Sequence, residues 1–185
     1  MKSADFKKIV TKELAPFLRQ NKWKGTGFDY TSHIENIVNL FTIQPSSSGG
    51  KFCIEVGIHF DFLPLKSDKE FSKLKTWDVG IRKRLSPHEG MDYWWSFPST
   101  DSEKTVLFDE IRELYLLNGT KYFEKYQNWK DLIPNITIEN IEKRDTIDIF
   151  PMPILRTSLY LAQINLYLSN DDKATKFAEF GLSKI

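Results

Sequence analysis

The sequence predicts an α+β fold: an N-terminal helix packed on a four- or five-stranded, mainly antiparallel sheet, followed by a helical C-terminal third. Three observations lead to this prediction. Residues 52–62 alternate between apolar and mostly polar side chains, which is the period of a strand with one dry face. A turn-rich stretch at 46–50 separates this strand from an apolar run at 37–43, as in a β-hairpin. Beyond residue 98 the apolar spacing becomes helical and ends in a helical hairpin.

The N-terminal half supplies the first helix and the strands. Apolar residues at helical spacing predict a helix from Phe6 to Leu18, and Pro16 predicts a kink or a break near Leu14 and Ala15. The other elements expected in this half are a turn at 21–27, short strands at 28–32, 79–85 and 93–97, and a short helix around 69–74.

The C-terminal half supplies the remaining helices. Thr100 and Glu103 have the spacing of a capping box, and the Asn118-Gly119 pair is expected to end the helix that Thr100 begins. Further helices are expected at 120–129, 137–144, 154–168 and 173–184. We expect an α+β part at 1–130 and a helical extension at 131–185 that packs on it to form one structural unit.

The bulk composition fits one ordinary globular domain. The chain has 185 residues, 41% of them hydrophobic and 28% charged. No stretch reaches the roughly 18 to 20 apolar residues that span a bilayer, and residues 1–8 lack the apolar core of a signal peptide. A single cysteine, Cys53, cannot form an internal disulfide, which suits a reducing compartment. We therefore expect a cytoplasmic protein that does not bind a membrane.

Charge is unevenly distributed, although the net charge is only +1. Residues 1–84 carry 15 Lys and Arg against 9 Asp and Glu, whereas residues 85–185 carry 11 against 16. This asymmetry would favour an acidic partner or self-association, but solvated lysines on a helix and a loop explain it more simply. Dedicated nucleic-acid domains concentrate basic charge more heavily, so no specific nucleic acid is expected as a partner. The oligomeric state stays open.

Four short motifs resemble a bacterial family, domain of unknown function 4304, over roughly residues 5–130. They are Val38-Asn39-Leu40-Phe41-Thr42-Ile43-Gln44, Val56-Gly57-Ile58, Ile81-Arg82-Lys83-Arg84-Leu85 and Asp92-Tyr93-Trp94-Trp95. The chain departs from the family's pattern at residues 21–23, where Gly-Phe is expected, and at Ser86, where glycine is usual. The resemblance implies a bacterial α+β domain and assigns no catalytic residue.

The polar face of the 52–62 strand holds Cys53, Glu55, His59 and Asp61, which are residue types that bind transition metals. At about 3.3 Å per residue, however, Cys53 lies about 20 Å and Glu55 about 13 Å from His59. Only His59 and Asp61, with backbones about 7 Å apart, could share an ion without another strand. Cys53 is within a strand and not at a helix N-terminus, where a thiolate would be favoured. We therefore expect no metal and no cofactor.

The strongest cluster in the sequence combines two arginines with aromatic residues. Arg82 and Arg84 share one strand face, and the turn at 87–90 would bring Trp94 or Trp95 opposite them. Paired arginines beside aromatic rings can bind a carboxylate or a phosphate, or stack on a planar ligand. In the simpler alternative the tryptophans cap the sheet and the arginines lie over them, bonded to Asp92 or Asp78.

The sequence favours a non-catalytic binding or protein-interaction domain, because it contains no convergent nucleophile, base or metal set. Its partner would be an unknown protein or a small anionic ligand. The alternative is a small-molecule enzyme that holds an anionic ligand with Arg82 and Arg84 and uses His59 or His88 as acid or base. A pocket shared by His59, Arg84 and Trp95 would favour the enzyme, and arginines engaged in salt bridges would disfavour it. A third possibility is a helical scaffold with an exposed apolar groove.

Overall fold

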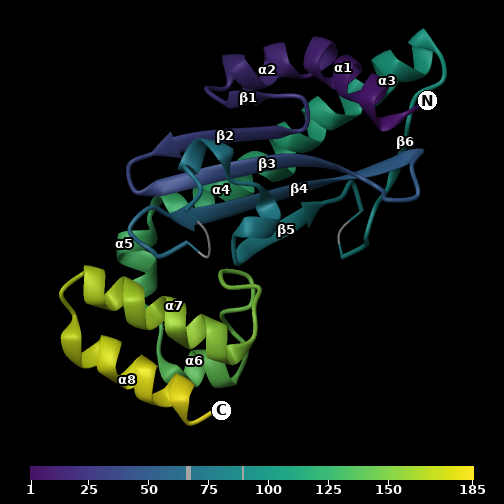
Figure 1. The fold of residues 1–185 in the computed structure, drawn as a ribbon. Coiled ribbons are helices and arrows are strands. Elements are labelled where there is room, and N and C mark those ends of the chain that lie inside the picture. Colours follow the sequence, from purple (N-terminus) through teal and green to yellow (C-terminus); the bar gives the residue numbers. More distant parts are fainter. Residues whose placement is uncertain (66–67, 89) are drawn as a thin grey trace.

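An antiparallel sheet of six strands lies at the centre of the computed structural model, which describes residues 1–65, 68–88 and 90–185 (Figure 1). The first five strands follow each other in chain order across the sheet, and the sixth pairs with the beginning of the fourth. Their bounds are β1 Lys24–Thr26, β2 Asp29–Ile34, β3 Ile37–Pro45, β4 Lys51–Phe60, β5 Ile81–Leu85 and β6 Trp95–Ser96. The predicted hairpin of 37–43 and 52–62 is confirmed as β3 and β4.

The register of β3 and β4 separates an apolar face from a mixed face. Phe41 lies opposite Val56, and Ile43 lies opposite Ile54, so these side chains share one face. On the other face Thr42 lies opposite Glu55, and Gln44 lies opposite Cys53. The register of β4 with β5, in which Leu85 lies opposite Ile54, in the same way decides which face each residue of β5 occupies.

Helices cover the apolar face. The N-terminal helix is interrupted as Pro16 predicts: α1 spans Ser3–Glu13 and α2 spans Ala15–Gln20. After the sheet, Thr100 caps α3, which spans Asp101–Leu114, through the predicted capping box with Glu103. Phe6 of α1 stacks on Phe97 at 4.3 Å between ring centroids and lies 4.8 Å from Phe52 of β4. These contacts fix the first helix on the sheet, as the sequence predicts.

The helical C-terminal part lies beyond one end of the sheet (Figure 1). Its elements are α5 Trp129–Leu132, α6 Ile138–Glu142, α7 Ile154–Tyr167 and α8 Asp171–Leu182. The last two form the predicted helical hairpin, with Ala162 and Ala174 among its buried residues. One contiguous cluster of buried apolar side chains runs from Phe6 to Phe177. No helix within the described residues has the length and apolar character needed to cross a membrane.

The structure differs from the sequence prediction in three places. The turn at 21–27 contains a short edge strand, β1, which brings the sheet to six strands. The Asn118-Gly119 pair does not end a helix: Tyr115–Gly119 forms a π-helical turn that continues into α4, Thr120–Gln127. Gly119 keeps helical dihedrals because the chain must go on to bury Tyr122, Phe123 and Tyr126 against the sheet. The helix expected around 69–74 is only a 3₁₀ turn, Phe71–Lys73.

The segment 68–80 covers the middle of the mixed face. Leu74 and Val79 of this segment form a small apolar cluster with Val38 and Leu40 of β3. A second 3₁₀ turn, Thr76–Asp78, lies over β4 and points the Thr76 hydroxyl at the sheet. The face that the sequence leaves half-solvated is therefore buried along much of its length by a loop.

Candidate functional site

The two arginines of the predicted cluster lie on β5, at the edge of the sheet. Ile81 and Leu85 are buried on the helix-covered face, so Arg82 and Arg84 stand on the mixed face, as predicted. In the observed register Arg84 lies opposite Glu55. The strand thus brings both guanidinium groups beside a carboxylate of β4.

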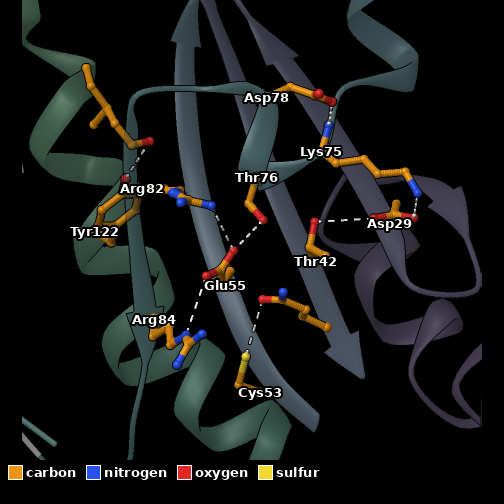
Figure 2. Close-up of polar contacts among 12 residues, drawn as sticks. Asp29, Thr42, Cys53, Glu55, Lys75, Thr76, Asp78, Arg82, Arg84 and Tyr122 are labelled. Carbon is orange, nitrogen blue, oxygen red and sulfur yellow. Dashed lines mark hydrogen bonds and ion pairs between the residues drawn. The ribbon is translucent and has the colours of Figure 1, made fainter. Parts of the chain in front are cut away.

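Glu55 joins β4, β5 and the segment 68–80 (Figure 2). Its side chain accepts a hydrogen bond of 2.8 Å from the Thr76 hydroxyl and one of 3.4 Å from Arg84 Nε. Arg82 Nη1 lies 3.7 Å from Glu55 Oε2. Glu55 is only 7% exposed, and a buried carboxylate is tolerated when it is both ion-paired and hydrogen-bonded. We call these four residues the Glu55 clamp, and we interpret it as a structural element.

Arg84 is engaged on three sides. Besides its bond to Glu55, Arg84 Nη1 donates to Asp92 Oδ2 at 2.5 Å, and its guanidinium lies 5.1 Å from the ring centroid of Trp94. The structure therefore brings Arg84, Asp92 and Trp94 together, as the spacing predicts. Asp78, the other expected partner, instead accepts bonds from Lys69 Nζ and the Lys75 backbone N–H.

Trp95 lies on the opposite side of the sheet from Arg84. It pairs with Phe52 in the β4–β6 ladder, stacks on that ring at 5.6 Å and is only 3% exposed. Its neighbour Trp94 remains half-buried at the surface. Because successive residues of a strand point to opposite faces, the two tryptophans cannot act on one ligand from the same side.

His59 lies near the far end of β4, opposite Val38. It is 2% exposed, and its Nε2 lies 3.2 Å from the Leu63 carbonyl oxygen. Because a carbonyl only accepts, Nε2 carries the proton and Nδ1 holds the lone pair. Burial lowers the pKa of His59, so the neutral ring is favoured. The Asp61 carboxylate contacts His33 Nε2 at 3.0 Å and the Asn36 amide.

Cys53 does not have the environment of a nucleophile. Its side chain is fully buried, and burial raises the pKa of its thiol to about 11. The thiol lies 3.6 Å from the side-chain oxygen of Gln44, the residue opposite it on β3. Within the described ranges no group of three or more His, Cys, Asp and Glu side chains could hold a metal ion.

A cleft of about 520 Å³ lies beside the clamp, between β5, the segment 76–80 and α7. Arg82 and Arg156 both line it, together with His59, Tyr160 and Gln163. We call it the arginine cleft. Gly80 lets α7 approach closely, because a Cβ there would come within 2.7 Å of the Tyr160 hydroxyl. Arg84 and Trp95 are not among the described residues that line it, so the pocket of His59, Arg84 and Trp95 is not formed.

Arg156 is the residue of this cleft that sequence reasoning missed. It lies on α7 and is 74 positions from Arg82, and no short motif joins them. Arg156 is exposed and forms no ion pair with any other described residue, whereas the Arg82 side chain is 46% exposed despite its contact with Glu55. The helix periodicity could have marked Arg156 as polar on an apolar helix, but only the packing of α7 shows what it faces.

Comparison with known proteins supports the resemblance noted in the sequence. Residues 14–125, more than half of the chain, match the family described as domain of unknown function 4304, DUF4304. No curated protein and no solved structure matches the chain. The matched region runs from the end of α1 into α4. It includes the β3–β4 hairpin, the Glu55 clamp, Trp94 and Trp95. The chain therefore belongs to the DUF4304 family.

Proposed function

We propose that the protein is a non-catalytic binding domain whose arginine cleft holds the carboxylate or phosphate group of a small anionic ligand. The observation that carries this proposal is the convergence of Arg82 and Arg156 on one cleft. A guanidinium is always charged and presents several donors that match the oxygens of a carboxylate or phosphate. Two such groups in a concave site can bind one anion together, and the Asp78 carboxylate that also lines the cleft is paired with Lys69.

The arrangement of the two β5 arginines supports this assignment. Arg84 is held by Glu55, Asp92 and Trp94, so its charge is already balanced within the fold. Among the described residues, Arg82 pairs only with Glu55, through the longer contact of 3.7 Å at Nη1. Glu55 thus lies beside one end of the Arg82 guanidinium and leaves its other donors available, as in a preorganised binding site.

The proposal is tested by titrating inorganic phosphate and citrate into the protein by isothermal titration calorimetry. We expect saturable binding that weakens at least about tenfold, or about 1.4 kcal/mol, in both Arg82→Ala and Arg156→Ala. Arg19→Ala is the matched control, because Arg19 is an exposed arginine of α2 outside the cleft. Equal affinities in the wild type, both cleft variants and the control would refute the proposal, as would the absence of saturable binding of either anion.

One observation favours an enzyme as the second candidate. His59 lines the same cleft as Arg82, and its neutral ring has a lone pair on Nδ1 that could accept a proton. His88 is not among the described residues that line this cleft: it follows β5, and its ring forms a T-shaped contact with that of Tyr93. Conversion of a bound anionic metabolite by the wild type, and its loss in His59→Gln with binding retained, would establish the enzyme.

We also propose that the protein is of bacterial origin and that it is located in the cytoplasm. The single cysteine is buried, and its high thiol pKa makes it inert, which fits a protein with no disulfide requirement. The bacterial origin is an expectation of the family resemblance.

A further inference from the structure

A second cleft, of about 360 Å³, lies on the helix-covered side of the sheet. It lies between the ends of β2 and β3 and the helical stretch that contains the π-helical turn and α4. Ser32 and Asn39 of the sheet line it, with Trp23, Tyr115 and Phe123 as its aromatic residues. We call it the Asn39 cleft. It shares no lining residue with the arginine cleft.

The floor of this cleft carries polar groups without partners. Asn39 stands between Ile37 and Phe41 on the apolar face and is only 7% exposed, and Ser32 beside it is 8% exposed. Neither side chain forms a hydrogen bond with another described residue. The polar atoms of Asn39 and Ser32 are not among those enclosed without a partner, so they face the open cleft and can bond to a ligand group there.

The aromatic wall is held in place by its own contacts. Trp23 Nε1 donates to the Tyr115 hydroxyl at 2.8 Å, and the Trp23 ring lies 5.2 Å from that of Phe123. Tyr115 begins the π-helical turn, and Thr120, which follows that turn, also lines the cleft. Single π-helical turns cost helix stability and are frequent at functional sites. The distortion here places an aromatic ring against the cleft.

The acidic side chains around the opening of the Asn39 cleft disfavour the binding of an anion there. Glu35 and Glu124 line the cleft, and no lysine or arginine is among its described lining residues. Lys130 contacts Glu35 at 3.9 Å, but both side chains are mostly exposed, so the pair is weak. A phosphate or carboxylate would meet two carboxylates without a counter-charge.

We infer that the Asn39 cleft binds a neutral or cationic planar nitrogen heterocycle of nucleobase to nucleoside size. The Asn39 amide presents a donor and an acceptor side by side, which matches the paired donor and acceptor on the edge of an adenine. Trp23, Tyr115 and Phe123 are 4%, 6% and 8% exposed, so they form a packed apolar wall against which a planar ring can lie. The volume suits a small ligand, and the acidic rim favours the nucleoside over its phosphorylated form. This inference is independent of the proposed function.

The test uses adenosine as the probe, with adenosine monophosphate as the charged counterpart, in isothermal titration calorimetry on the full chain. We expect saturable adenosine binding by the wild type. In Arg82→Ala, where the arginine cleft is weakened, we expect the monophosphate to bind at least about fivefold more weakly than adenosine. Asn39→Leu should weaken adenosine binding by at least about tenfold. The same variant should raise the melting temperature by a few degrees, about 2 to 5 °C, because a mostly buried amide among apolar neighbours is replaced by an apolar group of similar size.

Two further variants keep the result interpretable. Glu124→Arg, at an exposed position of α4, should obstruct the opening and weaken adenosine binding without touching the floor. Lys176→Ala, at an exposed position of α8 that lines neither cleft, should leave adenosine binding unchanged. The inference is overturned if adenosine shows no saturable binding, or if Asn39→Leu and Glu124→Arg both bind it like the wild type.

Discussion

The arginine cleft and the Asn39 cleft lie on opposite faces of one sheet, and they differ in how their polar groups are accommodated. Arg82 and Arg156 carry permanent charge, yet both keep contact with water, so their presence costs the fold little. Asn39 is uncharged but is only 7% exposed among apolar side chains, and its amide bonds to no other described residue. The burial of a polar group, more than its formal charge, therefore determines how much that group costs the fold.

The two faces also differ in what covers them. The apolar face is packed by α1 to α4, and its residues belong to the large cluster that reaches the C-terminal helices. The mixed face is covered by the segment 68–80, and the cluster that this segment forms with β3 contains four buried apolar residues in the described part of the chain, Val38, Leu40, Leu74 and Val79. With so little apolar burial, the loop depends on polar contacts such as those of Glu55.

The largest expected effect comes from breaking the Glu55 clamp. Glu55→Ala leaves the Arg84 guanidinium and the buried Thr76 hydroxyl without their shared acceptor, so we expect a loss of about 2 to 4 kcal/mol in the free energy of unfolding. Urea denaturation measures it. The matched control is Asp92→Asn, which removes the exposed partner of the same arginine and should cost at most about 1 kcal/mol. Equal losses in the two variants would show that burial is not what distinguishes the pairs.

An intermediate effect should appear when salt is added. Raising NaCl from about 50 mM to about 500 mM should weaken phosphate binding in the arginine cleft by about tenfold, because screening acts on exposed charges. Adenosine binding in the Asn39 cleft should change less than about twofold, since the Asn39 amide and the aromatic wall would recognise a ligand without net charge. Parallel titrations at both salt concentrations measure the contrast. The same salt dependence for both ligands would remove the electrostatic distinction between the clefts.

The smallest expected effect concerns His59. Burial lowers its pKa in the folded state, so the unfolded chain binds a proton more readily. The contribution of neutral His59 to the free energy of unfolding is fully present above the pKa of the unfolded chain, about 6.5. It is lost as the pH falls through the pKa of the folded state. The melting temperature of the wild type should therefore drop more steeply between about pH 7.5 and pH 5 than that of His59→Gln. Identical pH profiles would show that His59 is neither buried nor held neutral as the structure indicates.

Much of the candidate site could be expected from the sequence, and the contacts of Arg84 and Glu55 show why the rest could not. The alternation of 79–85 indicated that Arg82 and Arg84 share a face, and the turn after them brought Asp92 and Trp94 to Arg84 as expected. Glu55 was visible as a polar residue on its strand, but its pairing with Arg84 depends on the register between β4 and β5. A shift of one residue would have placed it opposite Lys83 or Leu85.

Local periodicity and local hydrogen bonds specify the hairpin of β3 and β4, the break at Pro16, the Thr100 cap of α3 and the terminal helical hairpin, so the sequence alone was enough to predict them. The tertiary structure decided that Trp95 enters the core while Trp94 meets Arg84. It also decided that the segment 68–80 closes the mixed face and that Arg156 reaches the cleft of Arg82. Asn39 was visible as one polar residue in an apolar run, but only packing shows that no other described residue satisfies it. These features arise from contacts between segments far apart in the chain, which no local pattern encodes.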